Sequence, residues 1–209
     1  MSSWDIRHNS ELKLMARQQL KGKRGFPILV CFLFCIITGA PSIIPYIGVI
    51  GTLILAGPMT LGKARFFLKF TRCESPSVET LFDGFKFFTS AFVLHLLIVI
   101  FTFLWTLLFI VPGIIAALRY SMAFYILNDN PGMSAMAALN QSKEMMEGHK
   151  GKLFLLGLSF IGWWILCILT LGIGFLWLTP YVELTMANFY EELKAGRRFS
   201  GAGTRDFNI

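Results

Sequence analysis

Three polar side chains interrupt long apolar stretches of the sequence. Arg119 is the only charged residue in positions 87–128, Glu183 is the only one in positions 153–190, and His95 lies in the first of these stretches. A lone charge in hydrocarbon costs about 2.5–3.5 kcal/mol, so such a residue usually faces other helices and finds a partner there. Arg119, Glu183 and His95 are therefore the candidate binding residues of the chain.

Arg119 and Glu183 stand at matching places in the sequence. Arg119 stands four residues before Ala123, which begins the string Ala123-Phe-Tyr125. Glu183 stands four residues before Ala187, which begins the string Ala187-Asn-Phe-Tyr190. The match predicts similar depths and an ion pair between Arg119 and Glu183. Such a pair can be a structural clasp between helices, or it can line a substrate or proton path. A histidine such as His95 more often forms a hydrogen bond to a neighbouring group than relays protons.

A third string, Ala64-Arg-Phe-Phe67, resembles the other two. All three stand near the end of a long apolar run, which indicates a degenerate threefold hairpin repeat. The alternative explanation is an aromatic belt of the kind that finishes many membrane helices.

The elements that carry these residues are predicted from the length of the apolar runs. The chain of 209 residues is 55% hydrophobic and only 15% charged, and its mean hydropathy is +0.63. Each of the three runs is about twice the 20 residues that one bilayer crossing needs, and each is broken by Pro or Gly near its middle. The sequence predicts an all-α polytopic membrane helix bundle of three hairpins, with spans at Phe26–Ala40, Ile43–Gly62, Ser90–Ile110, Val111–Asn128, Leu153–Thr170 and Gly172–Leu193.

Charge predicts the orientation. All 19 Lys and Arg residues lie in positions 1–25, 63–86, 119–152 and 194–205, and the hairpin tips contain none. Because basic residues collect in cytoplasmic loops, both termini are expected in the cytoplasm. Hairpins that dip into the bilayer and return would give the same pattern, and the proline-rich first run is the main candidate for this alternative.

Amphipathic helices are expected on the cytoplasmic side. Residues 1–25 form a basic N-terminal helix with Ser10 as its N-cap and an apolar stripe that contains Leu12 and Ala16; it lies on anionic phospholipid, or its charges only set topology. A second helix follows Pro76, and a third carries a stripe through Leu139 and Ser142. Residues 26–193 form the membrane domain, and residues 194–209 form a cytoplasmic tail.

The sequence contains none of the common catalytic or ligand-binding motifs. We find no Gly-rich phosphate loop, no His-Glu-x-x-His helix, no Gly-x-Ser-x-Gly elbow and no metal-ligand spacing. The sequence therefore predicts no enzyme, no cofactor and no metal. The net charge of +7 follows from topology, so no nucleic-acid partner is expected.

Several strings together resemble a bacterial family of multi-pass membrane proteins, domain of unknown function 975. They run from Gly57-Pro58 and Leu81-Phe-Asp-Gly-Phe85 through Trp105–Tyr125, Ala138–Gly148, Gly151–Phe154, Leu158–Trp163 and Leu169–Gly174 to Pro180-Tyr181 and Asn188-Phe-Tyr190. The resemblance implies a six-helix protein of the bacterial cytoplasmic membrane, with a looser likeness to the membrane domain of glycerophosphodiester phosphodiesterases. It implies no activity and no site residues.

Three functions are compatible with this pattern. The first is a non-enzymatic module for envelope or lipid homeostasis, which associates with a membrane protein partner or with further copies of itself. The second is a transporter, or a transporter subunit, for a small amphiphile or lipid, which would need a cavity lined by Arg119, Glu183 or His95. An intramembrane enzyme is the third, and no spacing in the sequence favours it.

Overall fold

The computed structural model describes residues 7–21, 25–39, 47–169 and 174–202, and within these ranges every regular element is a helix. The all-α prediction is confirmed for this part of the chain. In chain order the elements are α1 (Asn9–Leu20), α2 (Gly25–Gly39), α3 (Ile47–Thr71), the 3-10 helix η2 (Val78–Phe87), α4 (Phe88–Leu108), α5 (Ile110–Tyr120), α6 (Ala123–Asp129), α7 (Ala135–Met145), α8 (Lys150–Leu169) and α9 (Phe175–Ala202).

The helices follow the predicted segments with two differences. The fourth segment is interrupted at Ser121 and Met122, so it forms α5 and α6 rather than one helix. α3 and α9 also continue well past the predicted ends of their spans, which brings charged residues onto the same helices as the apolar segments.

One hairpin turn lies within the described residues, and it differs slightly from the prediction. The predicted spans meet between Ile110 and Val111, but the chain reverses at Phe109, whose backbone is extended (φ −161°, ψ 150°). Pro112 lies in the first turn of α5, where the missing N–H removes no helical hydrogen bond. The other two predicted turns fall largely on residues 40–46 and 170–173, outside the described part of the chain.

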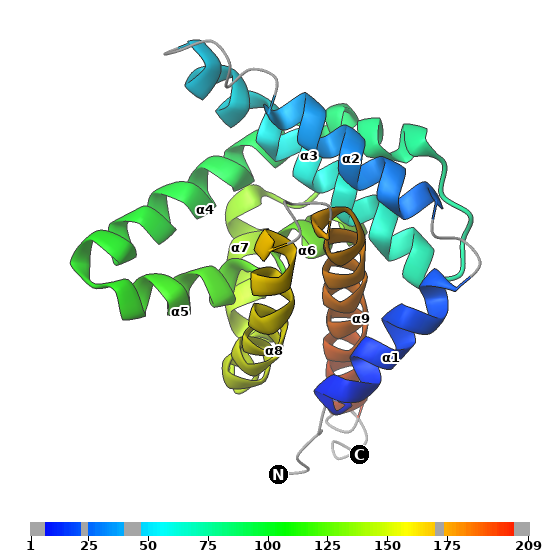
Figure 1. Cartoon of the computed structure of the whole chain (residues 1–209). Coiled ribbons are helices and arrows are strands. Elements are labelled where there is room, and N and C mark those ends of the chain that lie inside the picture. The colour runs from blue at the N-terminus through cyan, green and yellow to red at the C-terminus, as the bar shows by residue number, and fades with distance from the viewer. Residues whose placement is uncertain (1–6, 22–24, 40–46, 170–173, 203–209) are drawn as a thin grey trace.

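The hairpins point in different directions. In Figure 1 the α4–α5 hairpin projects to the left, while α8 and α9 run vertically beside α1. α1 begins, α8 begins and α9 ends at the same lower end of the molecule (Figure 1). These three helix ends lie away from the α4–α5 tip, which points to the left (Figure 1).

The N-terminal helix α1 packs on protein. Leu12, Ala16 and Leu20 are buried, and the side-chain amides of Gln19 and Asn188 of α9 exchange hydrogen bonds of 3.3 and 3.0 Å. This stripe confirms the predicted apolar face. The predicted Ser10 cap is wrong by two residues, because the helix begins at Asn9 and the ring of His8 accepts from the backbone N–H of Ser10.

The segment η2 lies directly against α3. A Cβ atom added to Gly62 would lie 1.8 Å from the carbonyl oxygen of Leu81, and one added to Gly84 would lie 1.9 Å from that of Pro58. Since no real Cβ atom approaches an oxygen so closely, both positions require glycine. This close backbone contact places the predicted amphipathic segment after Pro76 on the helix bundle.

The helix α7 also packs on the helix bundle. Ser134 caps it by accepting a hydrogen bond from the N–H of Ala137, and the left-handed backbone of Gly148 (φ 77°) follows its end. Its predicted stripe is buried, including Leu139 and Ser142. The Ser142 hydroxyl donates to the carbonyl oxygen of Arg119 at 2.7 Å, so α7 is fixed to the end of α5.

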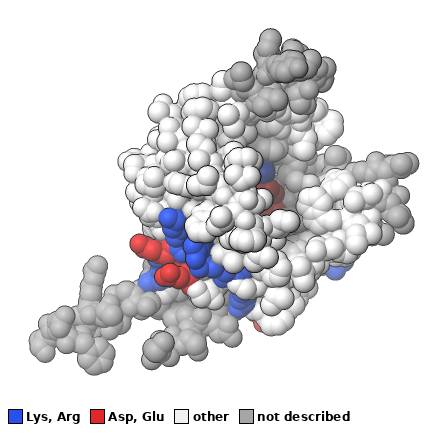
Figure 2. Space-filling view, turned by 90° about the vertical axis from the view of Figure 1, so that its left-hand side faces the viewer, with Lys and Arg blue, Asp and Glu red and all other residues white. Residues whose placement is uncertain are grey.

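Large apolar side chains cover much of the outer surface. On the α4–α5 tip, Leu107, Phe109 and Ile110 are each more than 70% exposed. Figure 2, which views the molecule from the side of this tip, shows a wide uncharged surface, with most of the visible charged side chains toward the lower left and a few in a hollow near the centre and at the lower right. Two segments, Val78–Leu108 and Ile110–Asp129, are long and apolar enough to cross a membrane.

Candidate functional site

Glu183 forms an ion pair with Lys63 of α3. The Nζ atom of Lys63 lies 2.7 Å from Oε1 of Glu183, and the two side chains are only 15% and 22% exposed. The same ammonium group lies 4.4 Å from the centroid of the Phe34 ring, on α2. A cation over an aromatic face is attracted by the ring quadrupole, so one lysine joins α2, α3 and α9.

The predicted pair between Arg119 and Glu183 is therefore wrong. α9 packs mainly against α1, α3 and α2, whereas α5 packs mainly against α4, so the two residues face different neighbours. No feature of the sequence favoured Lys63 as the partner, because the predicted span ends at Gly62 and the lysine was expected in a loop. The structure continues α3 to Thr71, and the long lysine side chain reaches back to the carboxylate.

Arg119 and His95 lie elsewhere in the bundle. Arg119 is half-buried at the end of α5, where its carbonyl group binds Ser142. His95 is half-buried in the middle of α4, and its ring lies 6.3 Å from that of Phe124 of α6. No contact joins Arg119, Glu183 and His95, so these described residues do not form one common site. Their role as ligand-binding residues stays a prediction.

A second cluster of charges joins the ends of α3 and α6 to the middle of α9. Asp129, at the end of α6, accepts hydrogen bonds from Arg72 at 2.8 Å, from the hydroxyl of Tyr190 at 2.8 Å, and from Lys194. Arg72 also donates to Glu191 at 2.8 Å. Burial opposes the charge on Arg72, but these carboxylates outweigh burial and raise its pKa. We call these five residues the exit cluster, because they stand just beyond the apolar parts of α3, α6 and α9.

The exit cluster follows the three aromatic strings of the sequence. The alanines of the strings, Ala64, Ala123 and Ala187, are all buried, as are the aromatic rings of Phe66, Phe67, Tyr125, Phe189 and Tyr190. The rings of Tyr125 and Tyr190 stack 5.4 Å apart. An aromatic belt would place such rings at the membrane surface. Their burial between helices does not suit a simple belt, and the threefold repeat stays a prediction.

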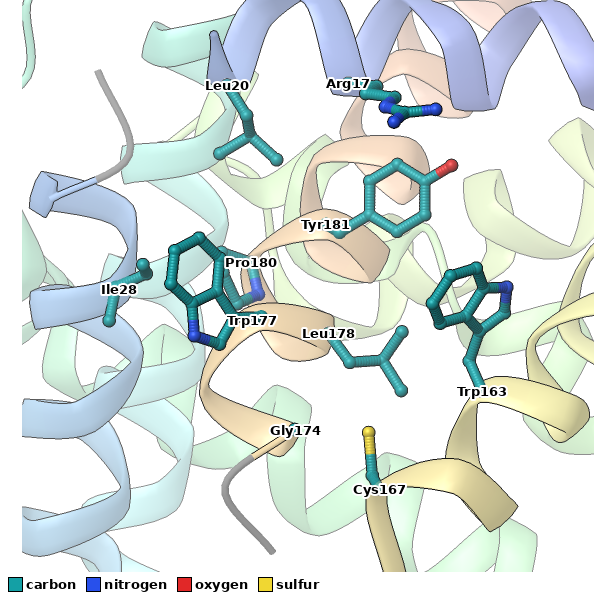
Figure 3. A pocket seen from close by; sticks show the side chains of 10 residues that line it. All are labelled: Arg17, Leu20, Ile28, Trp163, Cys167, Gly174, Trp177, Leu178, Pro180 and Tyr181. Carbon is teal, nitrogen blue, oxygen red and sulfur yellow. The ribbon is translucent and has the colours of Figure 1, made fainter. Parts of the chain in front are cut away.

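An apolar groove lies between α1, α2, α8 and α9. Its volume is about 440 Å³, which is within the range of small-molecule sites. Figure 3 shows Trp163 and Trp177 on opposite sides of it, Cys167 at one end, and Arg17 and Tyr181 at the other. The groove is lined by Arg17, Leu20, Ile28, Trp163, Cys167, Gly174, Trp177, Leu178, Pro180 and Tyr181.

No pattern in the sequence predicts this groove, because its residues come from four separate elements. Trp163 and Trp177 by themselves suggest only lipid-facing packing. Arg17 lies on a helix whose docking position depends on tertiary contacts. Among the described residues, no group of three His, Cys, Asp or Glu side chains is placed to hold a metal ion.

A comparison with models of protein families finds a match. The model of a family described as "Protein of unknown function (DUF975)" matches residues 1–117 and 107–197 of the chain. No curated protein and no solved structure matched.

Proposed function

We propose that this chain, which belongs to the DUF975 family of proteins of unknown function, is a multi-pass protein of the bacterial cytoplasmic membrane. We further propose that it serves as a non-enzymatic module for lipid or envelope homeostasis. The observation that carries the membrane assignment is the separation of apolar and charged surface. Leu107, Phe109 and Ile110 at the α4–α5 tip are each more than 70% exposed, while the exit cluster lies where the ends of α3 and α6 meet the middle of α9.

Exposure of such an apolar surface to water is unfavourable. Monomeric soluble proteins rarely expose contiguous apolar patches larger than a few hundred Å². α4 alone rises about 31 Å over its 21 residues, close to the thickness of the hydrocarbon layer. This length supports the proposal that α4 crosses the bilayer. The other crossings, and both termini in the cytoplasm, are proposed from the three apolar runs and from the distribution of Lys and Arg along the sequence.

For the first hairpin, entry into the bilayer and return on the same side stays an alternative to a full crossing. The 15 residues of α2 rise only about 22 Å, which is less than the roughly 30 Å of hydrocarbon. Lys63 also lies well within α3, with its ammonium group bound to Glu183. Both observations suit a hairpin that enters the bilayer from the cytoplasm and returns, as well as one that crosses a locally thinned bilayer.

The contacts of the charged residues support a module rather than an enzyme. The Glu183 carboxylate is bound by Lys63, and Asp129 is bound by three donors from two other helices. Side chains engaged in this way hold helices together, which is the common use of polar groups within membranes.

A transporter for a small amphiphile or lipid is the second candidate, and the apolar groove is the observation that favours it. The groove lacks Arg119, Glu183 and His95, the residues that a central transport path was expected to contain. It lies instead between the N-terminal helix and the third hairpin. This position suits binding of a ligand better than passage through the bundle.

Two experiments test the proposal. Membranes from cells that express the protein are washed with alkaline carbonate, and the protein is expected to stay in the pellet and to require detergent for extraction. Release by carbonate would contradict the membrane assignment. Purified protein is then reconstituted into liposomes with a fluorescent phospholipid. We expect no faster lipid movement between leaflets than in protein-free liposomes, and faster movement would favour the transporter.

A further inference from the structure

The two ends of the apolar groove differ in chemistry. Cys167, Leu178 and the two tryptophans give it apolar walls, and its other end is closed by Arg17 and Tyr181 (Figure 3). The guanidinium group and the tyrosine hydroxyl lie near each other at this end in Figure 3. A ligand that fits both ends has an apolar chain and an anionic head.

Arg17 is available for such a head. It is exposed, and it forms no ion pair with any residue in the described part of the chain. Its neighbours on α1 are engaged differently: Arg7 pairs with Glu192 at 3.0 Å, and Lys13 lies over the ring of Phe160 at 4.4 Å. Arginine binds phosphate through two parallel N–H groups, which gives both affinity and orientation.

We propose that the groove binds one acyl chain of an anionic phospholipid, with the phosphate on Arg17. This inference rests on the proposed membrane location and names a ligand for the module. The groove borders on α8, whose Trp163 lines it and is still 54% exposed. A lipid of the surrounding bilayer can therefore enter sideways, and α1 places Arg17 on the cytoplasmic side, where anionic headgroups are abundant.

Tryptophan quenching by brominated lipids tests this proposal directly. The chain has five tryptophans, so variants are made in which only Trp177, which lines the groove and is 56% exposed, or only Trp105, which is 42% exposed near the α4–α5 tip, remains. Each is reconstituted in phosphatidylcholine that contains increasing amounts of brominated phosphatidylglycerol or brominated phosphatidylcholine. We expect Trp177 to be quenched at lower concentrations of the brominated phosphatidylglycerol, and Trp105 to be quenched equally by both lipids.

Arg17→Gln gives the decisive comparison. One basic residue near the membrane surface is worth about 1 kcal/mol, so the variant is expected to weaken the preference of the Trp177 site about five-fold. Arg65→Gln removes the same charge from α3, where the arginine lies beside Phe87, and it should leave the preference intact. Cys167→Phe, which fills the apolar end, should lower the quenching of Trp177 by both lipids.

Each other result overturns part of the account. Equal quenching of Trp177 by the two lipids, or equal effects of Arg17→Gln and Arg65→Gln, would refute the anionic site. Quenching by a brominated fatty acid but not by phosphatidylglycerol would show that the ligand is a free acid rather than a phospholipid. If no brominated lipid quenched Trp105, the membrane location itself would fail, independently of the lipid site.

Discussion

The ion pair between Lys63 and Glu183 leads to a quantitative prediction. Glu183→Gln keeps the size of the side chain but removes its charge, so the Lys63 ammonium group stays largely buried without a counter-ion. Removing one partner of a buried pair typically costs 3–5 kcal/mol. Because both side chains keep some exposure, 15% and 22%, we expect the lower end of this range, about 3 kcal/mol of the free energy of unfolding.

Replacing both partners should be much less harmful. In Lys63→Met combined with Glu183→Leu, no charge remains to be buried, and buried pairs replaced by apolar residues of similar volume often lose no stability. The double-mutant cycle of Lys63 and Glu183 should therefore give a coupling energy of at least about 2 kcal/mol. The equivalent cycle of Arg119 and Glu183 should give a value near zero, since the structure does not bring these residues into contact.

The assay is equilibrium unfolding in mixed micelles with increasing sodium dodecyl sulfate, followed by circular dichroism. Glu144→Gln is a suitable control, because its carboxylate is 68% exposed and lies 3.3 Å from Arg197. Exposed pairs contribute at most about 1 kcal/mol. The reasoning is refuted if Glu183→Gln is no more destabilising than Glu144→Gln, or if Arg119 rather than Lys63 shows the coupling.

Three further predictions use the same assay. Gly62→Ala should destabilise the protein by about 3 kcal/mol or more, because its Cβ would collide with the carbonyl of Leu81. Gly157→Ala, whose Cβ would have nothing within 4 Å, should be neutral or stabilising. Equal effects of the two substitutions would contradict the close packing of η2 on α3. Asp129→Asn should lower the free energy of unfolding by about 2 kcal/mol, because three donors of the exit cluster lose a charged acceptor. A loss as small as that of Glu144→Gln would show that the cluster does not hold the helices together. Ser142→Ala should cost about 1 kcal/mol through the lost hydrogen bond to Arg119, and an unchanged midpoint would argue against docking of α7 at this point.

Local patterns were sufficient to predict most of the helices. Long apolar runs broken by Pro and Gly gave the hairpin segments, and the stripe through Leu139 and Ser142 correctly identified the buried face of α7. These features depend on spacing along the chain, which a sequence displays directly. The membrane crossings themselves, the orientation and the cytoplasmic ends stay predictions.

Contacts between distant segments were harder to predict. Arg119 was chosen as the partner of Glu183 from similar depth, but depth leaves open which helices are neighbours. Lys63 lies 120 residues before Glu183, and no local pattern links the two positions. The groove at Arg17 was hard to predict for the same reason. Arg17 belongs to it only when α1 packs against α8 and α9, which are distant in the sequence.

The central claim is that the hairpins enter a bilayer from the cytoplasmic side, and a tag at the α4–α5 tip tests it most directly. A short epitope is inserted after Phe109, and a second version carries it after Asn130, beyond α6. In intact spheroplasts we predict that antibody binds the tag at Phe109 and reaches the tag at Asn130 only after permeabilisation. Antibody binding at Phe109 only from the cytoplasmic side would contradict the crossing.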